Sequence, residues 1–314
     1  MNKIITTLLM MLICSTVFAE PVEIDGIYYN LDASTKEAEV AKYITKQYSG
    51  TIAIPKEITR EASRYSVTSI ANQAFIGCFN LTSITIPSSI KSIGNSAFNG
   101  CDALSSIKVD ADNVIFDSRE GCNAIIETSS NTVIKGCKNT TIPNSVTGIG
   151  NAAFFDVASL TSIFIPNSVT KIGNDAFNGC SGLTNIIIPN SVVSIGNSAF
   201  SGCTSLYSIT ILSETLGMGT FSFALCGNLQ SFVLISSTPP SDYFTSFFYE
   251  SATDNATLYV PAGSKAAYQA ADGWKDFSQI VEIGSVKGDV NGDGDVTAQD
   301  ASLILQKVAG KADR

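Results

Sequence analysis

The chain has 314 residues, a formal net charge of −9 and no histidine. This acidity argues against a nucleic-acid partner, because phosphate binding needs a basic face. The lack of histidine excludes Ser-His and Cys-His nucleophilic pairs, histidine-ligated zinc and the usual general base, so any catalysis would depend on carboxylates, Lys, Tyr or Cys.

Residues 1–19 are predicted to be a cleaved secretory signal peptide. One early lysine, Lys3, precedes the apolar residues 4–14, and Ala19 supplies a small residue at the cleavage point. The apolar stretch is shorter than the roughly 20 residues that a membrane span needs. We therefore expect a mature chain that begins at Glu20 and is secreted or displayed at the cell surface, with no membrane span.

Residues 20–63 are predicted to form an N-terminal cap, and residues 64–235 a solenoid of 23-residue repeats. Three columns keep this spacing, apart from one interval that is 33 residues longer: Phe75, Phe98, Phe154, Phe177, Phe200 and Phe223; Cys78, Cys101, Cys180, Cys203 and Cys226, with Val157 in the sixth slot; and Leu81, Leu104, Leu160, Leu183, Leu206 and Leu229. No single repeat can bury its own apolar face, so coils about 4.8 Å apart are expected to share one core.

Each repeat reads I-G-N-x-A-F-x-G-C-x-x-L-x-x-I-x-I-P. The L-x-x-I-x-I part predicts a short strand with inward apolar side chains, which the proline ends. The glycine of I-G-N is expected to permit unusual backbone angles and the asparagine to cap the following turn. These positions are Gly94, Gly150, Gly173 and Gly196, and Asn95, Asn151, Asn174 and Asn197.

The stretch IPNSVTKIGNDAFNGCSGLTNI resembles the leucine-rich repeats of the BspA-like family of bacterial surface and secreted proteins, and the resemblance covers residues 64–235. It implies a curved, ligand-binding solenoid that serves in adhesion or protein–protein contact. The expected fold class is accordingly mainly β, a leucine-rich repeat solenoid with short strands, little helix and a cap at each end.

The long interval corresponds to an irregular insertion at residues 110–140. Strand-like residues 124–126 and 132–134 flank the turn-like Ser129 and Ser130, which predicts a β-hairpin or an irregular coil. A two-residue turn there would place Cys122 opposite Cys137, and export would permit a disulfide between them. The column cysteines are expected to be small buried thiols, because Val157 fills the same slot.

Residues 236–284 are predicted to form the C-terminal cap. Residues 257–260 and 279–283 are expected to be strands, and residues 264–271 a short helix that Ser264 caps. Trp274, the single tryptophan, is expected in the core of this cap rather than as a platform for a sugar.

A ligand is expected on the concave face of the solenoid, where outward strand residues form two columns. One column is Ser83, Ser106, Ser162, Asn185, Ser208 and Ser231, and the other is Thr85, Lys108, Phe164, Ile187, Thr210 and Val233. Phe164 and Ile187 would form an exposed apolar step that a ligand could cover, with Lys108 and Val233 as further contacts. Simple β-propensity at strand positions explains the same residues without a ligand.

The stretch GDVNGDGDVTAQD, residues 288–300, has the spacing of a calcium loop. Oxygen ligands fall at loop positions 1, 3, 5, 7, 9 and 12, and Gly294 at position 6 makes the sharp turn. The predicted ligands are Asp289, Asn291, Asp293, Asp295, Thr297 and Asp300. The following residues 301–310 are apolar at helical spacing, which predicts a packed helix. The alternative is a merely acidic tail.

Residues 288–314 also resemble one repeat of a type I dockerin, the module that plugs into cohesin domains of cellulosome-like assemblies. The resemblance implies a Ca²⁺ cofactor and cohesin contacts through Ala298, Gln299, Leu305 and Gln306. Two departures are visible: dockerins carry two such repeats and this sequence has one, and position 12 is Asp300 rather than the Glu of ordinary EF-hands.

The leading hypothesis is a non-catalytic binding or adhesion protein whose solenoid contacts a host or bacterial surface protein or glycan. Its dockerin-like segment would attach it to a cohesin-bearing partner in a polysaccharide-degrading complex. The alternatives are a dockerin-bearing glycoside hydrolase and a structural stalk without a ligand. Glycoside hydrolysis needs two carboxylates about 5 to 9.5 Å apart on a rigid cleft. Repeats, caps and calcium loop leave no room for a catalytic domain, so we expect no enzyme.

Overall fold

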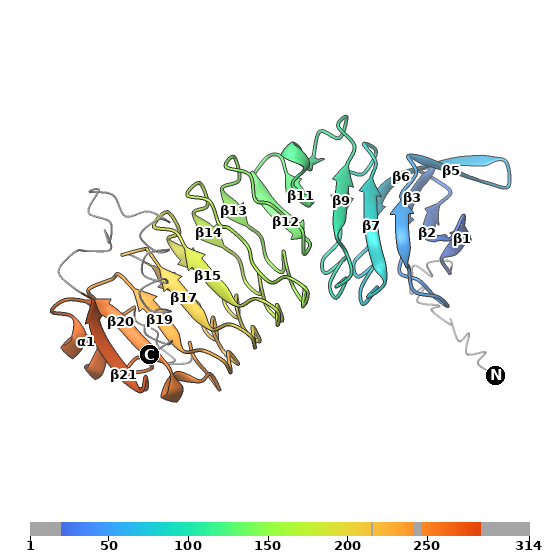
Figure 1. Cartoon of the computed structure of the whole chain (residues 1–314). Helices are drawn as coiled ribbons and strands as arrows, with labels where there is room; N and C mark the ends of the chain where they lie inside the picture. Colours follow the sequence, from blue (N-terminus) through green and yellow to red (C-terminus); the bar gives the residue numbers. More distant parts are fainter. Residues whose placement is uncertain (1–19, 215, 241–246, 284–314) are drawn as a thin grey trace, which may run out of the picture.

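The computed structural model describes residues 20–214, 216–240 and 247–283. Their coils stack into one elongated, curved solenoid that runs from β1 (Val22–Ile24) to β21 (Gln279–Ile283) (Figure 1). The fold is mainly β, with about 9 turns and 5% helix. The predicted fold class, a leucine-rich repeat solenoid with little helix, is therefore confirmed.

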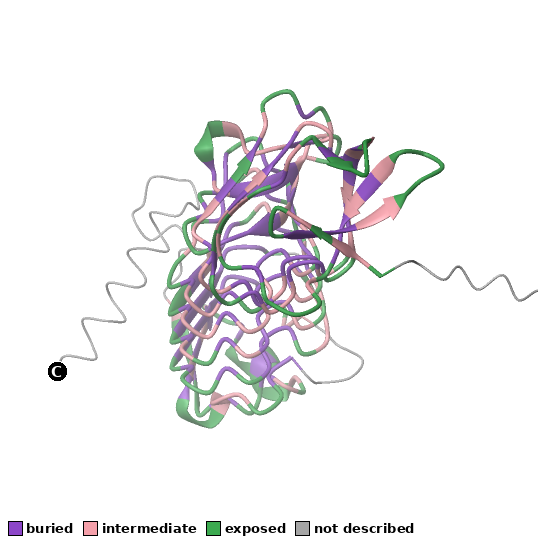
Figure 2. Ribbon diagram, turned by 90° about the vertical axis from the view of Figure 1, so that its right-hand side faces the viewer, coloured by how far each residue is buried: buried purple, intermediate pink, exposed green. Residues whose placement is uncertain are grey.

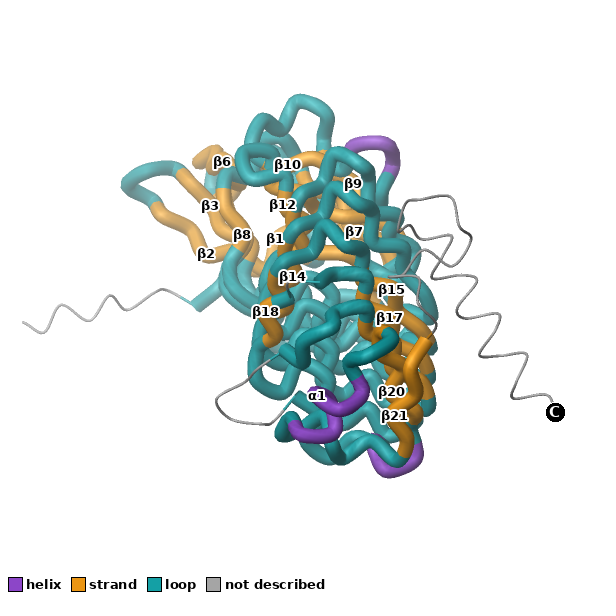
Figure 3. Tube along the Cα trace, turned by 90° about the vertical axis from the view of Figure 1, so that its left-hand side faces the viewer, coloured by secondary structure: helices purple, strands orange, loops and turns teal. Residues whose placement is uncertain are grey.

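Two series of parallel strands line opposite sides of the coils (Figure 3). The longer strands come from the L-x-x-I-x-I part of each repeat, and we call their side the long-strand face: β4 (Gly50–Ala53), β7 (Leu81–Ile86) and β9 (Ser106–Val109), then β15 (Asn185–Ile188), β17 (Ser208–Ile211), β19 (Ser231–Leu234), β20 (Thr257–Pro261) and β21. Neighbouring strands of this face pair at equivalent positions of the 23-residue repeat: Asn185 pairs with Ser208, and Ser208 pairs with Ser231.

The opposite side, here the short-strand face, carries two-residue strands that begin just before the repeat glycine. They are β8 (Ser92–Ile93), β13 (Gly148–Ile149), β14 (Lys171–Ile172), β16 (Ser194–Ile195) and β18 (Gly217–Met218). β13, β14, β16 and β18 pair in succession in parallel, whereas β8 pairs with β6 (Ser63–Ile70) of the N-terminal cap.

The repeat columns fill the space between the two faces (Figure 2). The rings of Phe154, Phe177 and Phe200 stack face to face with centroids 4.9 and 5.0 Å apart, close to the separation of neighbouring strands. The column cysteines are free and buried, and Val157 in the same slot is 1% exposed. The prediction of small buried thiols is confirmed.

The repeat glycine and asparagine do not have their predicted roles. Gly173 has no positive φ; instead, a Cβ there would lie 2.6 Å from the Asn151 side-chain oxygen and 2.7 Å from its backbone nitrogen, in the preceding coil. The Asn151 side chain does not cap its own turn. Its Oδ1 accepts a hydrogen bond from the backbone N–H of Asn174, one coil further on, at 2.9 Å. Both residues therefore serve contact between coils.

The insertion forms the predicted hairpin and interrupts the stack. β11 (Ala124–Glu127) pairs antiparallel with β12 (Thr132–Gly136) and with β10 (Phe116–Asp117), beside the 3-10 turn Arg119–Gly121. The possible disulfide between Cys122 and Cys137 is not formed in this structure, where both cysteines are free. A register shift between Ile125 and Ile126 separates their environments, so that Cys122 packs in the C-terminal core cluster and Cys137 in the N-terminal one.

The two ends of the stack contain elements that do not follow the 23-residue repeat. The N-terminal end adds antiparallel pairs through β2 (Ile27–Asp32) with β1, and β5 (Glu57–Arg60) with β6, while β3 (Glu37–Val40) joins β2 to β6. At the C-terminal end, the predicted strands occur as β20 and β21 and the predicted helix as α1 (Lys265–Ala270), with a 3-10 turn at Thr253–Asn255.

Trp274 lies in the core of the C-terminal end, as predicted. It is fully buried, and its indole N–H donates to the Pro240 carbonyl at 2.9 Å. The predicted capping of the helix by the Ser264 side chain is wrong, because this hydroxyl donates to the Pro261 carbonyl, back toward β20, at 2.6 Å.

Candidate functional site

The long-strand face is interrupted between β9 and β15. The repeat pattern predicts a strand at residues 162–165, but these residues are not a strand, although the same positions of the next repeat form β15. The insertion and the coil after it lie immediately before this segment, so it has no regular ladder to extend. The segment therefore stands beside β15 without completing the sheet.

Phe164 stands at the middle of this interruption. Its side chain is 64% exposed, one of the most exposed large apolar side chains in the described part of the chain. Two hollows flank it. One, of about 340 Å³, opens toward β15 and is lined by Phe164, Ile187, Pro189 and Leu212 among others. The other, of about 280 Å³, opens toward the insertion and includes Glu120, Ile142 and Asn144.

We call Phe164, Ile187 and the residues that line these two hollows the Phe164 patch. Its rim is polar, formed by Ser162, Asn167 and Asn185 on one side and by Asn144 and Glu120 on the other. Glu120 and Cys122 are the ionisable groups that line the hollows, and burial raises the pKa of the Cys122 thiol. The patch is thus an apolar centre with a mainly uncharged rim.

The structure brings together two of the four predicted contacts. Ile187 is half-buried beside Phe164, where it also packs against the small apolar cluster of Leu212 and Ile235. Lys108 is exposed on β9, on the other side of the interruption, so it points outward as predicted but lines neither hollow.

The prediction that Val233 contacts a ligand is wrong. Its side chain is fully buried, as is that of Thr210, its neighbour on β17. On the other side Val233 pairs with Tyr259 of β20, and Ile187, Leu212 and Ile235 add apolar packing nearby. This end of the face is packed, and the accessible apolar surface is displaced toward Phe164.

Sequence reasoning missed Leu212 and Glu120 as members of the patch. Leu212 stands where other repeats have the strand-ending proline. This departure from the repeat could have indicated that the surface is more apolar at this position. Glu120 belongs to the insertion, whose path no periodicity describes.

The predicted calcium and cohesin residues lie outside the described residues. These are Asp289, Asn291, Asp293, Asp295, Thr297 and Asp300, with Ala298, Gln299, Leu305 and Gln306. Among the described residues, no group of three or more Cys, Asp or Glu could hold a metal ion. No helix within residues 20–283, so far as they are described, has the length and apolar character to cross a bilayer.

Comparisons with known proteins agree with the repeat architecture. Residues 56–135 and 125–251 match the family model described as BspA type leucine rich repeat region, in six copies. No curated protein matches the chain.

Several solved structures are similar to this chain. A leucine-rich repeat protein from Eubacterium ventriosum is 18% identical with a TM-score of 0.48, over 70% of this chain and 59% of that chain. The pneumococcal vaccine antigen PcpA is 15% identical with a TM-score of 0.46, over 84% and 98%. A leucine rich cell surface protein from Faecalibacterium prausnitzii is 20% identical with a TM-score of 0.32, over 85% and 96%.

Proposed function

Because the chain belongs to the BspA type leucine-rich repeat family, we propose that it is an exported, non-catalytic binding protein that holds a protein partner on its Phe164 patch. Solenoids of this kind present an extended surface on rigid stacked coils, which suits recognition more than chemistry. Export rests on the signal-peptide pattern of residues 1–19.

The exposed phenyl ring of Phe164 is the observation that carries the proposal. A ring that is 64% exposed between two hollows costs free energy in water, and a partner that covers it recovers this cost. Protein interfaces concentrate their binding energy in such central aromatic anchors, and a surrounding polar rim keeps water out. The asparagines and serine around Phe164 provide such a rim.

The Phe164→Ser variant tests this proposal. Because the ring is exposed, the melting temperature should stay within a few degrees of the wild type, while a lost anchor should weaken partner binding at least tenfold. Surface plasmon resonance against a panel of purified host matrix proteins and bacterial surface proteins measures the affinity. The single variant is preferable to a double change with Ile187→Ser, because Ile187 also packs against Leu212 and Ile235.

Phe79→Ser is the matched control, since Phe79 is 59% exposed but lies at a turn before β7, away from the patch. It should bind every captured partner as the wild type does. An equal loss of partner affinity in both variants would show non-specific adhesion through exposed phenyl rings. Unchanged binding by Phe164→Ser would refute the proposal that the Phe164 patch holds the partner.

We further propose that residues 288–300 bind Ca²⁺ and that residues 288–314 attach the protein to a cohesin. The support is the ligand spacing from Asp289 to Asp300 with Gly294 at the turn. Extracellular calcium is millimolar, so a dissociation constant of about 10⁻⁴ M, typical of extracellular modules, would suffice.

The double variant Asp289→Ala/Asp300→Ala should abolish calcium uptake in isothermal titration calorimetry. Its repeat domain should melt as in the wild type, because the Phe and Leu columns that form the core are elsewhere. Absence of uptake by the wild-type protein at millimolar calcium would contradict the metal site. Uptake without capture by a cohesin would keep the site and reduce the segment to a structural tail.

A glycoside hydrolase remains the competing function. Release of reducing sugars from plant polysaccharides by the purified protein would establish it in place of the non-catalytic proposal.

A further inference from the structure

The short-strand face has a break of its own, between β8 and the insertion. β8 pairs with β6, and β12 pairs with β13 and β11, so no described pairing joins β8 to the next coil. The phenylalanine stack has the same break: Phe75 stacks on Phe98, and Phe154 begins a second stack with Phe177. The core divides here into two clusters.

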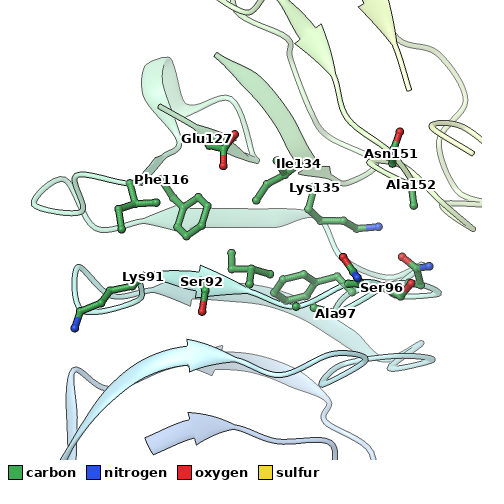
Figure 4. A pocket seen from close by; sticks show the side chains of 16 residues that line it. Lys91, Ser92, Ser96, Ala97, Phe116, Glu127, Ile134, Lys135, Asn151 and Ala152 are labelled. Atoms are coloured by element: carbon green, nitrogen blue, oxygen red, sulfur yellow. The ribbon is translucent and has the colours of Figure 1, made fainter. Parts of the chain in front are cut away.

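A cavity of about 370 Å³ occupies this break (Figure 4). Ile93 and Phe98 contribute to the wall on the β8 side, and Phe116 and Ile134 to the wall on the insertion side. Asn95, Ser96, Asn99 and Asn151 add uncharged polar side chains to the same cavity. Glu127 adds a carboxylate, which accepts a hydrogen bond from the Ser130 hydroxyl at 2.6 Å. Its volume lies in the range of about 300 to 1,000 Å³ that is usual for small-molecule sites.

Lys135 reaches into this cavity from β12. Figure 4 shows its side chain lying between the two walls, on the side where Asn151 and Ala152 lie. The residue is 4% exposed, and its ammonium nitrogen has no hydrogen-bond partner in the described structure. By contrast Lys91, at the other end of the cavity in Figure 4, is exposed and pairs with Glu37 at 3.5 Å.

No described side chain accepts a hydrogen bond from the Lys135 amine. The titratable groups that act on it are the thiols of Cys101, Cys137 and Cys180 and the carboxyl of Asp156. Burial lowers the pKa of Lys135, and these four groups oppose that shift. No ion pair with Lys135 is formed among the described residues. A buried ammonium without a partner is unfavourable, so an anion that accepted a hydrogen bond from Lys135 in the cavity would stabilise the charged form of this residue.

We propose that this cavity binds a small amphiphilic carboxylate, with its carboxylate accepting a hydrogen bond from Lys135 and its apolar body lying between the walls. Glu127 lines the cavity on the Phe116 side and Lys91 lies at the far end, whereas Lys135 lies on the side of Asn151 (Figure 4). Around Lys135 itself the polar lining is uncharged, so this side of the cavity matches one negative charge. A phosphate would call for more cationic donors than these lining residues provide. Ile93, Phe98, Phe116 and Ile134 would cover the hydrocarbon part.

Isothermal titration calorimetry of the full chain with octanoate, and with octanol as the uncharged analogue, tests this proposal. Octanoate should bind more tightly than octanol to the wild type. Lys135→Met, which keeps the length of the side chain and removes its charge, should weaken octanoate binding at least tenfold and leave octanol binding unchanged. Lys108→Met is the matched control, because Lys108 is exposed on β9 outside the cavity, and it should bind octanoate as the wild type does.

Absence of octanoate binding to the wild type, or equal binding by Lys135→Met, overturns the proposal. If Lys135→Met does not fold, the wild-type protein with ¹³Cε-labelled lysine decides by NMR. Octanoate should then move the Lys135 signal and leave that of Lys108, which lies on the other face, in place. A Lys135 signal that does not respond also overturns the proposal. Phe164→Ser should bind octanoate normally, which separates this site from the protein-binding patch.

Discussion

Cys180 shows how closely one position of the repeat is adapted to burial. It is fully buried, and its thiol donates to the Phe154 carbonyl of the preceding coil at 3.1 Å. Val157 occupies the same slot one coil earlier, so the slot accepts an aliphatic side chain of similar size. Burial raises the pKa of the Cys180 thiol from 9.0 to about 12.

This shift predicts a dependence of stability on pH. The native state keeps the thiol protonated up to about pH 12, whereas the unfolded chain loses the proton near pH 9, so the stabilising contribution is complete below pH 9 and is lost as the pH rises toward 12. The loss is about 1.4 kcal/mol per pH unit for this group. Cys180→Val removes it.

Urea unfolding at pH 7.5 and pH 10.5 measures the effect. Cys180→Val should change the unfolding free energy at pH 7.5 by less than about 1.5 kcal/mol, as volume-conserving core changes do. Between the two pH values it should lose about 2 kcal/mol less than the wild type. An identical loss in both proteins would mean that this thiol does not titrate differently in the two states.

Phe177 predicts a much larger effect, because rings stack on both of its faces at 4.9 and 5.0 Å. Phe177→Ala should open a cavity shared with the neighbouring coils and lower the unfolding free energy by about 3 to 5 kcal/mol. Phe79→Ala is the exposed control and should change it by about 0.5 kcal/mol or less. Similar losses in the two variants, measured by urea unfolding, would place Phe177 outside the core.

At the scale of the element, each coil is fitted to the next through the I-G-N turn. The Asn174 side chain repeats the arrangement of Asn151: its Oδ1 accepts from the backbone N–H of Asn197 at 2.9 Å. The Oδ1 of Asn197 in turn accepts from the Thr220 N–H at 3.0 Å. The glycine before each asparagine lets the backbones approach closely enough for this ladder.

Gly173→Ala should therefore destabilise the stack by about 1 to 3 kcal/mol, as overpacking does, because its Cβ would meet backbone atoms of the preceding coil. Gly227→Ala is the matched control, since a Cβ there meets nothing within 4 Å. Thermal unfolding of both variants checks the prediction. Equal melting temperatures would show that the coils separate at no cost.

The elements themselves could be predicted from the sequence, and their contacts only in part. Strand β15, the hairpin of β11 and β12, and helix α1 follow from local periodicity and turn residues. The roles of Gly173 and Asn151 depend on the distance between coils, which periodicity does not report. The missing strand at residues 162–165 depends on what precedes it in space, so the pattern that correctly gave β15 failed one repeat earlier.

At the scale of the whole molecule, one insertion shapes both proposed sites. Residues 110–140 divide the core into two clusters and leave the Lys135 cavity on the short-strand face. On the other face, the insertion contributes Glu120 and Cys122 to the Phe164 patch. One hydrogen bond links the coils before and after the insertion: the backbone N–H of Ser159 donates to the Asp102 carboxylate at 2.6 Å.

The sequence indicated single residues of the candidate site but not how they are arranged. Phe164 was identifiable because an aromatic residue stands in a column of outward positions. Val233 stands in the same column and is buried, because exposure depends on neighbours such as Tyr259 and Leu212 that the column does not reveal. The Lys135 cavity could not be predicted from the sequence, because a lysine in an irregular hairpin is ordinarily exposed.

Hydrogen–deuterium exchange of the protein, free and bound to a partner captured from the panel, tests the central claim most directly. Partner binding should slow exchange at residues 162–165 and in β15, on both sides of the hollow beside Phe164. Exchange in β14 and β16 on the short-strand face should not change. Protection confined to the short-strand face or to the ends of the stack, with residues 162–165 unaffected, would contradict a protein-binding function of the Phe164 patch.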